Sequence, residues 1–163
     1  MSHPNETLIK HFYDALGKCD SAAMAACYAD QARFSDPVFG DLDAAAARAM
    51  WAMLCARASD LDIVVSDIEA NDRRGRARWV ARYTFAKTGR KVHNVIDASF
   101  EFADGRIVTN MDCFDLWRWA AMALGIKGRL LGWLPSVQNA IRREAAKGLQ
   151  AYRRRNATGH TMS

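Results

Sequence analysis

The spacing of apolar and polar positions divides the chain into a helical beginning, a strand-rich middle and a helical end. Residues 5–17 repeat large apolar side chains at helical spacing, and a short helix follows, capped by Asp20 or Ser21. An Ala-rich helix is predicted over roughly 43–58, and the sequence FSDPVFG breaks the chain before it. The inward sides of these helices are expected to carry Leu8, Ile9, Phe12, Tyr13, Leu16, Met24, Cys27, Tyr28, Met50 and Trp51.

After Ser59 the period of apolar positions changes from 3.6 to two, which is typical of strands with one buried face. Strands are predicted over residues 61–70, 76–86, 91–102 and 106–115. Helices followed by an antiparallel meander indicate the α+β class. The apolar face of the sheet needs helices laid on it. If the sheet is strongly curved and wraps around these helices, it encloses a conical pocket.

Polar residues interrupt the inward face of this predicted sheet. Asn94 falls among the apolar positions of 91–102. The inward positions of the last strand are Val108, Asn110, Asp112 and Phe114. An aspartate that points into a core must be either paired or functional, because an isolated buried charge is costly. Partners that would make Asp112 merely structural are Tyr13, Tyr28 and Asn94.

Charge is distributed unevenly along the chain. Residues 1–115 hold 14 Lys or Arg and 17 Asp or Glu, whereas residues 116–163 hold nine Lys or Arg and Glu144 as their one acid. A nucleic-acid-binding domain spreads basic residues through its fold, so this pattern argues against a nucleic-acid partner. The end of the chain is predicted to form a basic helical extension over 121–155 and a disordered tail over 156–163.

The basic extension has two interpretations. The favoured one is a pair of helices, separated at Pro135, that cover the mouth of the pocket or contact a second subunit. The alternative is an amphipathic segment over residues 117–134 that lies on an anionic membrane surface.

Other features exclude further classes of protein. No run of eighteen apolar residues exists and the first residues, MSHPNETLIK, lack a signal-peptide pattern, so a cytoplasmic location is expected. The four cysteines lie in apolar contexts without metal-ligand spacing and are expected to be buried thiols. We expect no metal and no cofactor.

The order of elements, together with FSDPVFG and ADGRIVTNMDCFDLW, resembles the nuclear transport factor 2-like superfamily and its SnoaL-like branch over about residues 5–120. The resemblance implies a cone-shaped α+β barrel, a curved antiparallel sheet wrapped around the N-terminal helices, as one domain over 1–120. Members include ketosteroid isomerase, limonene-epoxide hydrolase and polyketide cyclases. It also implies a homodimer through the outer face of the sheet, which is predicted to carry Arg78, Arg82, His93, Asp97 and Glu101.

Three positions match functional residues of that superfamily. Asp36 resembles the catalytic base of ketosteroid isomerase, and Tyr13 its oxyanion-stabilising tyrosine. Asp112 is similar to the acid/base aspartate of limonene-epoxide hydrolase and the SnoaL cyclases. The second oxyanion donor of the isomerase and the SnoaL histidine both fall at Ala98. The neighbouring Asp97 does not take that role, because it lies on the other face of its strand.

Two carboxyl groups in one apolar pocket can divide proton transfer, one ionised as base and one protonated as acid. The catalytic candidates are therefore Asp112, Asp36 and Tyr13, although Asp36 can also be a turn cap and Tyr13 a core aromatic residue. The residues expected to contact substrate are Asn94, Asn110, Trp79, Tyr83, Phe100, Phe114, Tyr28, Phe34 and Trp51.

The sequence thus predicts a cofactor-independent acid–base enzyme that acts on a small hydrophobic, oxygenated molecule, with isomerase-like or cyclase-like chemistry. Epoxide hydrolysis is not favoured, because the partners it needs fall near Trp79 and Ala81. The alternative is a non-catalytic binder of an apolar ligand, attached to a membrane surface through the basic helices.

Overall fold

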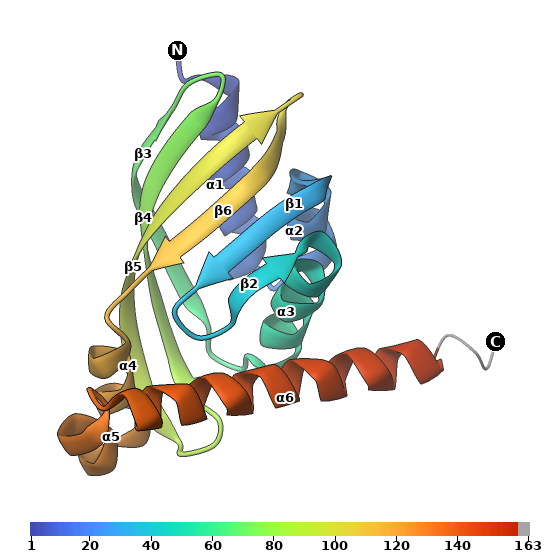
Figure 1. Cartoon of the computed structure of the whole chain (residues 1–163). Coiled ribbons are helices and arrows are strands. Elements are labelled where there is room, and N and C mark those ends of the chain that lie inside the picture. The colour runs from blue at the N-terminus through green and yellow to red at the C-terminus, as the bar shows by residue number, and fades with distance from the viewer. Residues whose placement is uncertain (160–163) are drawn as a thin grey trace.

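In the computed structural model, which describes residues 1–159, six strands form one curved, open sheet (Figure 1). They are β1 (Tyr28–Asp36), β2 (Gly40–Asp43), β3 (Asp62–Ala70), β4 (Arg74–Phe85), β5 (Arg90–Ala103) and β6 (Arg106–Cys113). Their order across the sheet is β2-β1-β6-β5-β4-β3. The antiparallel meander from β3 to β6 and the α+β class confirm the predicted fold.

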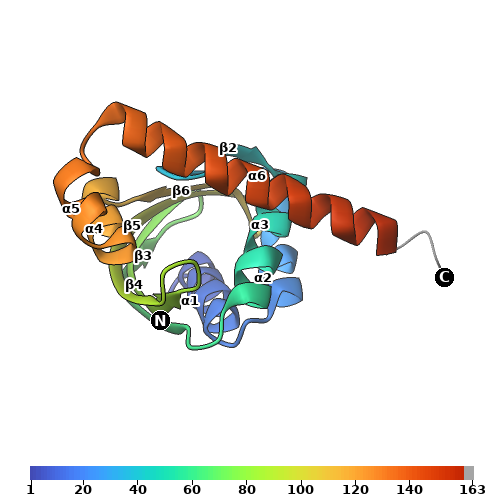
Figure 2. The same ribbon diagram turned by 90° about the horizontal axis from the view of Figure 1, so that it is seen from below.

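Three helices lie against the concave face of the sheet: α1 (Pro4–Gly17), α2 (Ser21–Cys27) and α3 (Ala44–Arg57) (Figures 1 and 2). Each begins at a side-chain cap, since His3, Asp20 and Asp43 accept a hydrogen bond from a backbone N–H of the first turn. Their apolar sides meet the inward face of the sheet in one core.

The hairpin of β1 and β2 was not predicted from the sequence. Its burial does not alternate along β1, because the pairing register with β6 shifts between Tyr28 and Arg33. β1 runs parallel to β6, so the sheet is mixed. A second irregularity, where β5 pairs with β6, turns Ile107 inward, and Val108 is only half-buried. The prediction of an inward Val108 was therefore wrong.

The C-terminal part forms α4 (Leu116–Leu124), α5 (Ile126–Leu131) and α6 (Pro135–Gly159). The prediction of two helices separated at Pro135 missed the break at Gly125, whose φ of 73° ends α4. α6 runs across the end of the sheet and past α3 (Figures 1 and 2). It is held there by Arg142, whose Nε donates to the Pro37 carbonyl at 2.9 Å, and by Leu149, which is buried in the main core. Residues 156–159 of the predicted tail are helical, and 160–163 lie outside the described residues.

Cys27 is buried and Cys55 half-buried, but Cys19 and Cys113 are exposed, so the prediction of four buried thiols was wrong for those two. Cys113 follows Asp112 on β6 and points to the opposite, outer face. No helix within residues 1–159 is long and apolar enough to cross a membrane.

Candidate active site

Asp112 lies near the end of β6 on the inward face of the sheet, opposite Ala98 of β5. It is 4 % exposed. Trp79 Nε1 donates to Asp112 Oδ1 at 3.4 Å, a long hydrogen bond, and Oδ2 accepts none from residues 1–159. Burial, and then the charge of Asp36, raises the pKa of Asp112 well above its ordinary value. Among the described residues, none of the structural partners considered for Asp112 (Tyr13, Tyr28 and Asn94) is hydrogen-bonded to it, and its partner is Trp79.

Asp36 ends β1 and closes the turn to β2. Its Oδ1 accepts the backbone N–H groups of Val38, at 2.8 Å, and Phe39, at 2.5 Å, so the expected turn cap is present. Burial raises the pKa of Asp36 to about 6, and the two backbone hydrogen bonds oppose that rise. The turn uses only one of the two carboxyl oxygens, Oδ1.

The parallel pairing of β1 with β6 brings the two aspartates together. Ser35 is in register with Met111, so Asp36 and Asp112 are the next residues of adjacent strands, which lie about 4.8 Å apart. Phe34 and Asn110, the preceding inward pair, are both buried. The two carboxyl groups therefore occupy neighbouring inward positions.

Tyr13 reaches the same region from α1. Its side chain is 2 % exposed, and its hydroxyl has no hydrogen-bond partner among the described residues. Its ring lies 5.2 Å from that of Trp79, the donor to Asp112. Burial, and then the charge of Asp112, raises the pKa of Tyr13, so the hydroxyl keeps its proton. A buried hydroxyl without a partner is a costly arrangement in a core and a useful one in a binding site.

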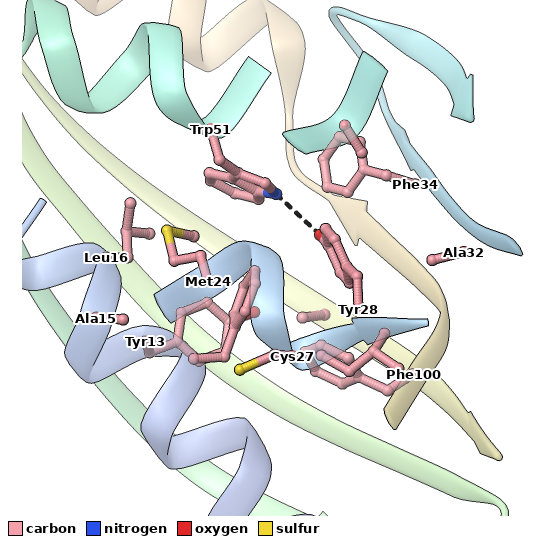
Figure 3. Close-up of a cluster of buried hydrophobic side chains, with 14 of the residues drawn as sticks. Tyr13, Ala15, Leu16, Met24, Cys27, Tyr28, Ala32, Phe34, Trp51 and Phe100 are labelled. Atoms are coloured by element: carbon pink, nitrogen blue, oxygen red, sulfur yellow. Dashed lines mark hydrogen bonds between the residues drawn. The ribbon is translucent and has the colours of Figure 1, made fainter. Parts of the chain in front are cut away.

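Tyr28, Trp51 and Asn110 form a second polar group deeper in the cone. Trp51 Nε1 and Asn110 Nδ2 donate to the Tyr28 hydroxyl at 2.8 and 2.9 Å (the first bond is dashed in Figure 3). The Asn110 Oδ1 atom is buried and has no partner within residues 1–159. These three residues are fixed by one another, and Asn110 still has a free acceptor.

The other predicted contact residues line the inward faces of the strands. Asn94 and Phe100 are buried, and Phe34 packs against Trp51 with ring centroids 5.5 Å apart. Tyr83 and Phe114 are half-buried at the end of the sheet nearest α4. Figure 3 shows Tyr13, Tyr28, Trp51, Phe34 and Phe100 within one cluster of side chains.

Trp119 of α4 belongs to this site and was not predicted. Its Nε1 donates to the Tyr83 hydroxyl at 2.8 Å. Burial, and also the charge of Asp36, raises the pKa of Tyr83. The available signal was the spacing of Leu116, Trp119, Ala120 and Ala123, which marks one buried side of a helix.

The predicted conical pocket is largely filled by its own aromatic side chains. Trp51 contacts both Phe34 and Trp79, whose ring centroids lie 5.5 and 6.2 Å from its own. A hollow of about 420 Å³ opens instead between α2, α3 and α6, and one of about 340 Å³ at the turn from β3 to β4. Neither of these two is lined by Asp36, Asp112 or Tyr13.

Comparisons with known proteins agree with this fold. The profile of the SnoaL-like domain family matches residues 9–110, more than half of the chain. No curated protein matches the sequence.

Solved structures with the same fold are numerous and distant in sequence. IdmH of Streptomyces antibioticus, a proposed polyketide cyclase, is 23 % identical with a TM-score of 0.64, over 76 % of this chain and 99 % of its own. An M. tuberculosis LEH-like epoxide hydrolase is 17 % identical (TM-score 0.63; 81 % and 96 %). A Catenulispora acidiphila protein with a ketosteroid isomerase-like fold, in complex with trimethylamine, is 12 % identical (TM-score 0.66; 78 % and 97 %). At these identities the likeness concerns the fold alone.

Proposed function

Because the chain belongs to the SnoaL-like domain family, we propose that it is a cofactor-independent acid–base enzyme acting on a small hydrophobic, oxygenated molecule. One observation carries the proposal: the buried carboxyl group of Asp112 has a single long hydrogen bond. It lies next to Asp36 and close to the unpartnered hydroxyl of Tyr13. Titratable groups with raised pKa values that share one apolar site are typical of proton-transfer enzymes.

In this proposal, each group has a role that suits its raised pKa. With a pKa of about 6, Asp36 is ionised at neutral pH and acts as the base. Burial, and then the charge of Asp36, raises the pKa of Asp112, which favours its protonated form and suits it to act as acid or hydrogen-bond donor. Tyr13 keeps its proton and donates to developing negative charge.

The simplest reaction for these roles begins beside a carbonyl group. Asp36 takes a proton from the adjacent carbon, and the electron pair moves onto the carbonyl oxygen, which accepts hydrogen bonds from Tyr13 and Asp112. If Asp36 returns the proton to a different carbon, the product is an isomer. If the enolate carbon attacks a second carbonyl of the same molecule, a carbon–carbon bond forms and the new alkoxide takes a proton from Asp112.

Substrate contacts in this proposal come from the inward face of the sheet and from α3 and α4. Asn110 offers an unpaired acceptor oxygen, and Trp119 with Tyr83 bounds the end near Asp36. The apolar contacts are Trp79, Phe100, Phe114, Phe34, Trp51 and Tyr28, with Asn94 as a further polar contact.

Deuterium exchange tests this function with a defined probe, the small aromatic ketone 2-tetralone. In D₂O its α-protons are lost from the ¹H NMR spectrum, and the protein should accelerate that loss above the buffer rate. D36N should lower the acceleration by about 10²–10⁴-fold and D112N should also lower it. D30N removes an exposed carboxylate from the same strand as Asp36 and should have no effect.

The same experiment separates catalysis from the alternative, a non-catalytic binder. The observation that favours a binder is that Asp36 already holds its turn through Oδ1. If 2-tetralone resonances broaden on binding but exchange no faster than in buffer, the protein is a binder. Unchanged exchange in both D36N and D112N would remove these aspartates from the mechanism.

We further propose that residues 1–120 form the SnoaL-like domain, that 121–155 are its basic helical extension, and that two copies pair through the outer face of the sheet. That face carries ion pairs between Arg78 and Asp97, at 2.9 Å, and between Arg82 and Asp62, at 3.5 Å. It also exposes Val64, Val95 and Met111, which a partner would cover.

A further inference from the structure

Helix α5 buries its small residues and exposes its large ones, the reverse of ordinary helix packing. A Cβ atom at Gly128 would lie 1.9 Å from the Ala120 carbonyl oxygen of α4, and one at Gly132 would lie 3.1 Å from Trp117. Only glycine permits such an approach, so α5 is held on α4 by its glycine side. Its large apolar side chains consequently face outward.

These outward side chains, together with Trp117 of α4, make up the α4–α5 patch, which consists of Trp117, Ile126, Leu130, Leu131 and Trp133. Their exposed fractions range from 46 % for Trp117 and Leu131 to 74 % for Ile126. The indole N–H groups of Trp117 and Trp133 donate to the carbonyls of Arg129 and Leu130, both at 3.0 Å, which fixes the two rings. Exposed apolar groups gathered in this way mark an interaction surface.

Helices α4 and α5, which carry the patch, lie at one corner of the molecule beyond the end of the sheet (Figure 1). The same helices expose Arg118, Lys127 and Arg129 beside it. From Leu116 onward the chain holds nine basic residues and a single acid, Glu144. A second copy of this surface would bring like charge against it, so the occupant carries negative charge.

The surface of an anionic lipid bilayer combines negative charge, an apolar interior and favourable contact with tryptophan. Indole rings and Lys or Arg side chains favour the boundary between lipid headgroups and acyl chains. We propose that the α4–α5 patch docks on the surface of an anionic phospholipid bilayer. Ile126, Leu130 and Trp133 enter the acyl boundary, and Lys127 and Arg129 contact the headgroups.

Docking in this way would orient the rest of the molecule. Trp119 lies on the same helix as Trp117 and donates to the Tyr83 hydroxyl. Burial, and also the charge of Asp36, raises the pKa of Tyr83. The Asp36 end of the sheet is therefore directed toward the bilayer, a source of hydrophobic molecules. This inference stands on the patch alone and does not depend on catalysis.

The test is co-sedimentation of the full chain with vesicles of phosphatidylcholine and phosphatidylglycerol (7:3) and with pure phosphatidylcholine. The wild type should bind the anionic vesicles at least about tenfold more strongly. I126S/L130S should reduce the partition coefficient about tenfold, because both side chains are exposed and contribute to the bilayer contact. K127Q/R129Q should reduce it similarly.

The matched control is R73Q/R106Q, which removes the same charge from exposed positions at the β3–β4 and β5–β6 turns. It should bind like the wild type. Lipids brominated in the acyl chains should quench wild-type tryptophan emission but not that of W117F/W133F, whose remaining tryptophans are buried. Circular dichroism checks that each variant is folded.

Three results would overturn the proposal. One is the absence of binding to anionic vesicles, which would leave an acidic protein as the occupant. Another is wild-type binding by I126S/L130S, which would mean that charge alone holds the chain on the surface. The third is equal weakening by R73Q/R106Q and K127Q/R129Q, which would mean attraction by net charge and not by this patch.

Discussion

At the scale of single residues, the carboxyl group of Asp36 both closes a turn and titrates near neutral pH. Its Oδ1 accepts two backbone hydrogen bonds, which favour the ionised form, yet burial outweighs them and raises its pKa to about 6. Because an asparagine oxygen can accept the same two bonds, D36N separates the charge from the turn. Ionisation of this buried carboxyl group lowers the stability of the folded state, and the turn does not require the charge.

The stability of the wild type relative to D36N should therefore fall as the pH rises. A carboxyl whose pKa is raised in the folded state binds more protons folded than unfolded between pH 3.8 and about 6. Its contribution is complete below pH 3.8 and is lost through pH 6, in total about 3 kcal/mol of the free energy of unfolding. Urea titrations at pH 4, 5, 6 and 7 measure the difference, and D30N serves as control. A difference that stays constant with pH would contradict the assignment.

Loss of the hydroxyl group should change the free energy of unfolding differently at the two buried tyrosines, Tyr28 and Tyr13. Y28F leaves the N–H groups of Trp51 and Asn110 without an acceptor and should lower the free energy of unfolding by about 2 kcal/mol. Y13F removes a hydroxyl that has no partner among residues 1–159 and should leave stability unchanged or higher. In 2-tetralone exchange, Y13F should lower the rate about tenfold or more. Equal destabilisation by both variants would mean that the Tyr13 hydroxyl is bound in the core.

At the scale of elements, the site depends on which strands are neighbours. β1 and β6 are far apart in the sequence, and their parallel pairing is what places Asp36 beside Asp112. α4 closes the same end, packing Trp119 against Phe85 with ring centroids 5.3 Å apart and donating to Tyr83. α5 in turn depends on the glycine contact with α4.

Adding one methyl group at that contact should detach α5. G128A puts a Cβ atom 1.9 Å from the Ala120 carbonyl oxygen, so the helices must separate, at a cost of about 1–3 kcal/mol. G148A in α6 meets only Arg57 at 3.5 Å and should stabilise the helix by about 1 kcal/mol. Thermal unfolding compares the two, and hydrogen exchange of α5 should rise in G128A alone. Wild-type stability of G128A would show that the contact adapts.

At the scale of the whole molecule, the two faces of the sheet serve different purposes. The concave face holds the core and the candidate site, and the outer face exposes Val64, Val95 and Met111 among paired charges. α6 crosses the end of the sheet. Its Leu149 is buried in the main core, and its Arg142 donates to the Pro37 carbonyl. The outer face, proposed to contact a second copy, and the α4–α5 patch, proposed to contact a bilayer, are thus separate surfaces.

V95R should convert the expected dimer into a monomer. The substitution places a charge at the centre of the outer face, where a partner would have to bury it. Sedimentation equilibrium measures the mass of wild type and variant. A146R, on the exposed side of α6, adds the same charge elsewhere and should stay dimeric. A monomeric wild type at 100 µM would refute pairing through this face.

The sequence by itself determined the three N-terminal helices, the meander and the face of nearly every inward residue on it. Asp112, Asn94 and Asn110 were placed correctly because the direction of a strand side chain follows from a local period of two. That rule failed at Val108, since a shift of register is set by the partner strand and leaves no mark in local periodicity.

Only the tertiary structure decided what depends on contacts between distant segments. The β1–β6 pairing, the bond from Trp119 to Tyr83, the filling of the cone by Trp51 and Trp79, and the outward turn of α5 are all of this kind. Each is fixed by which surfaces fit together once the chain has folded. Local patterns indicate that a side is apolar, but the packing of the whole chain decides what covers it.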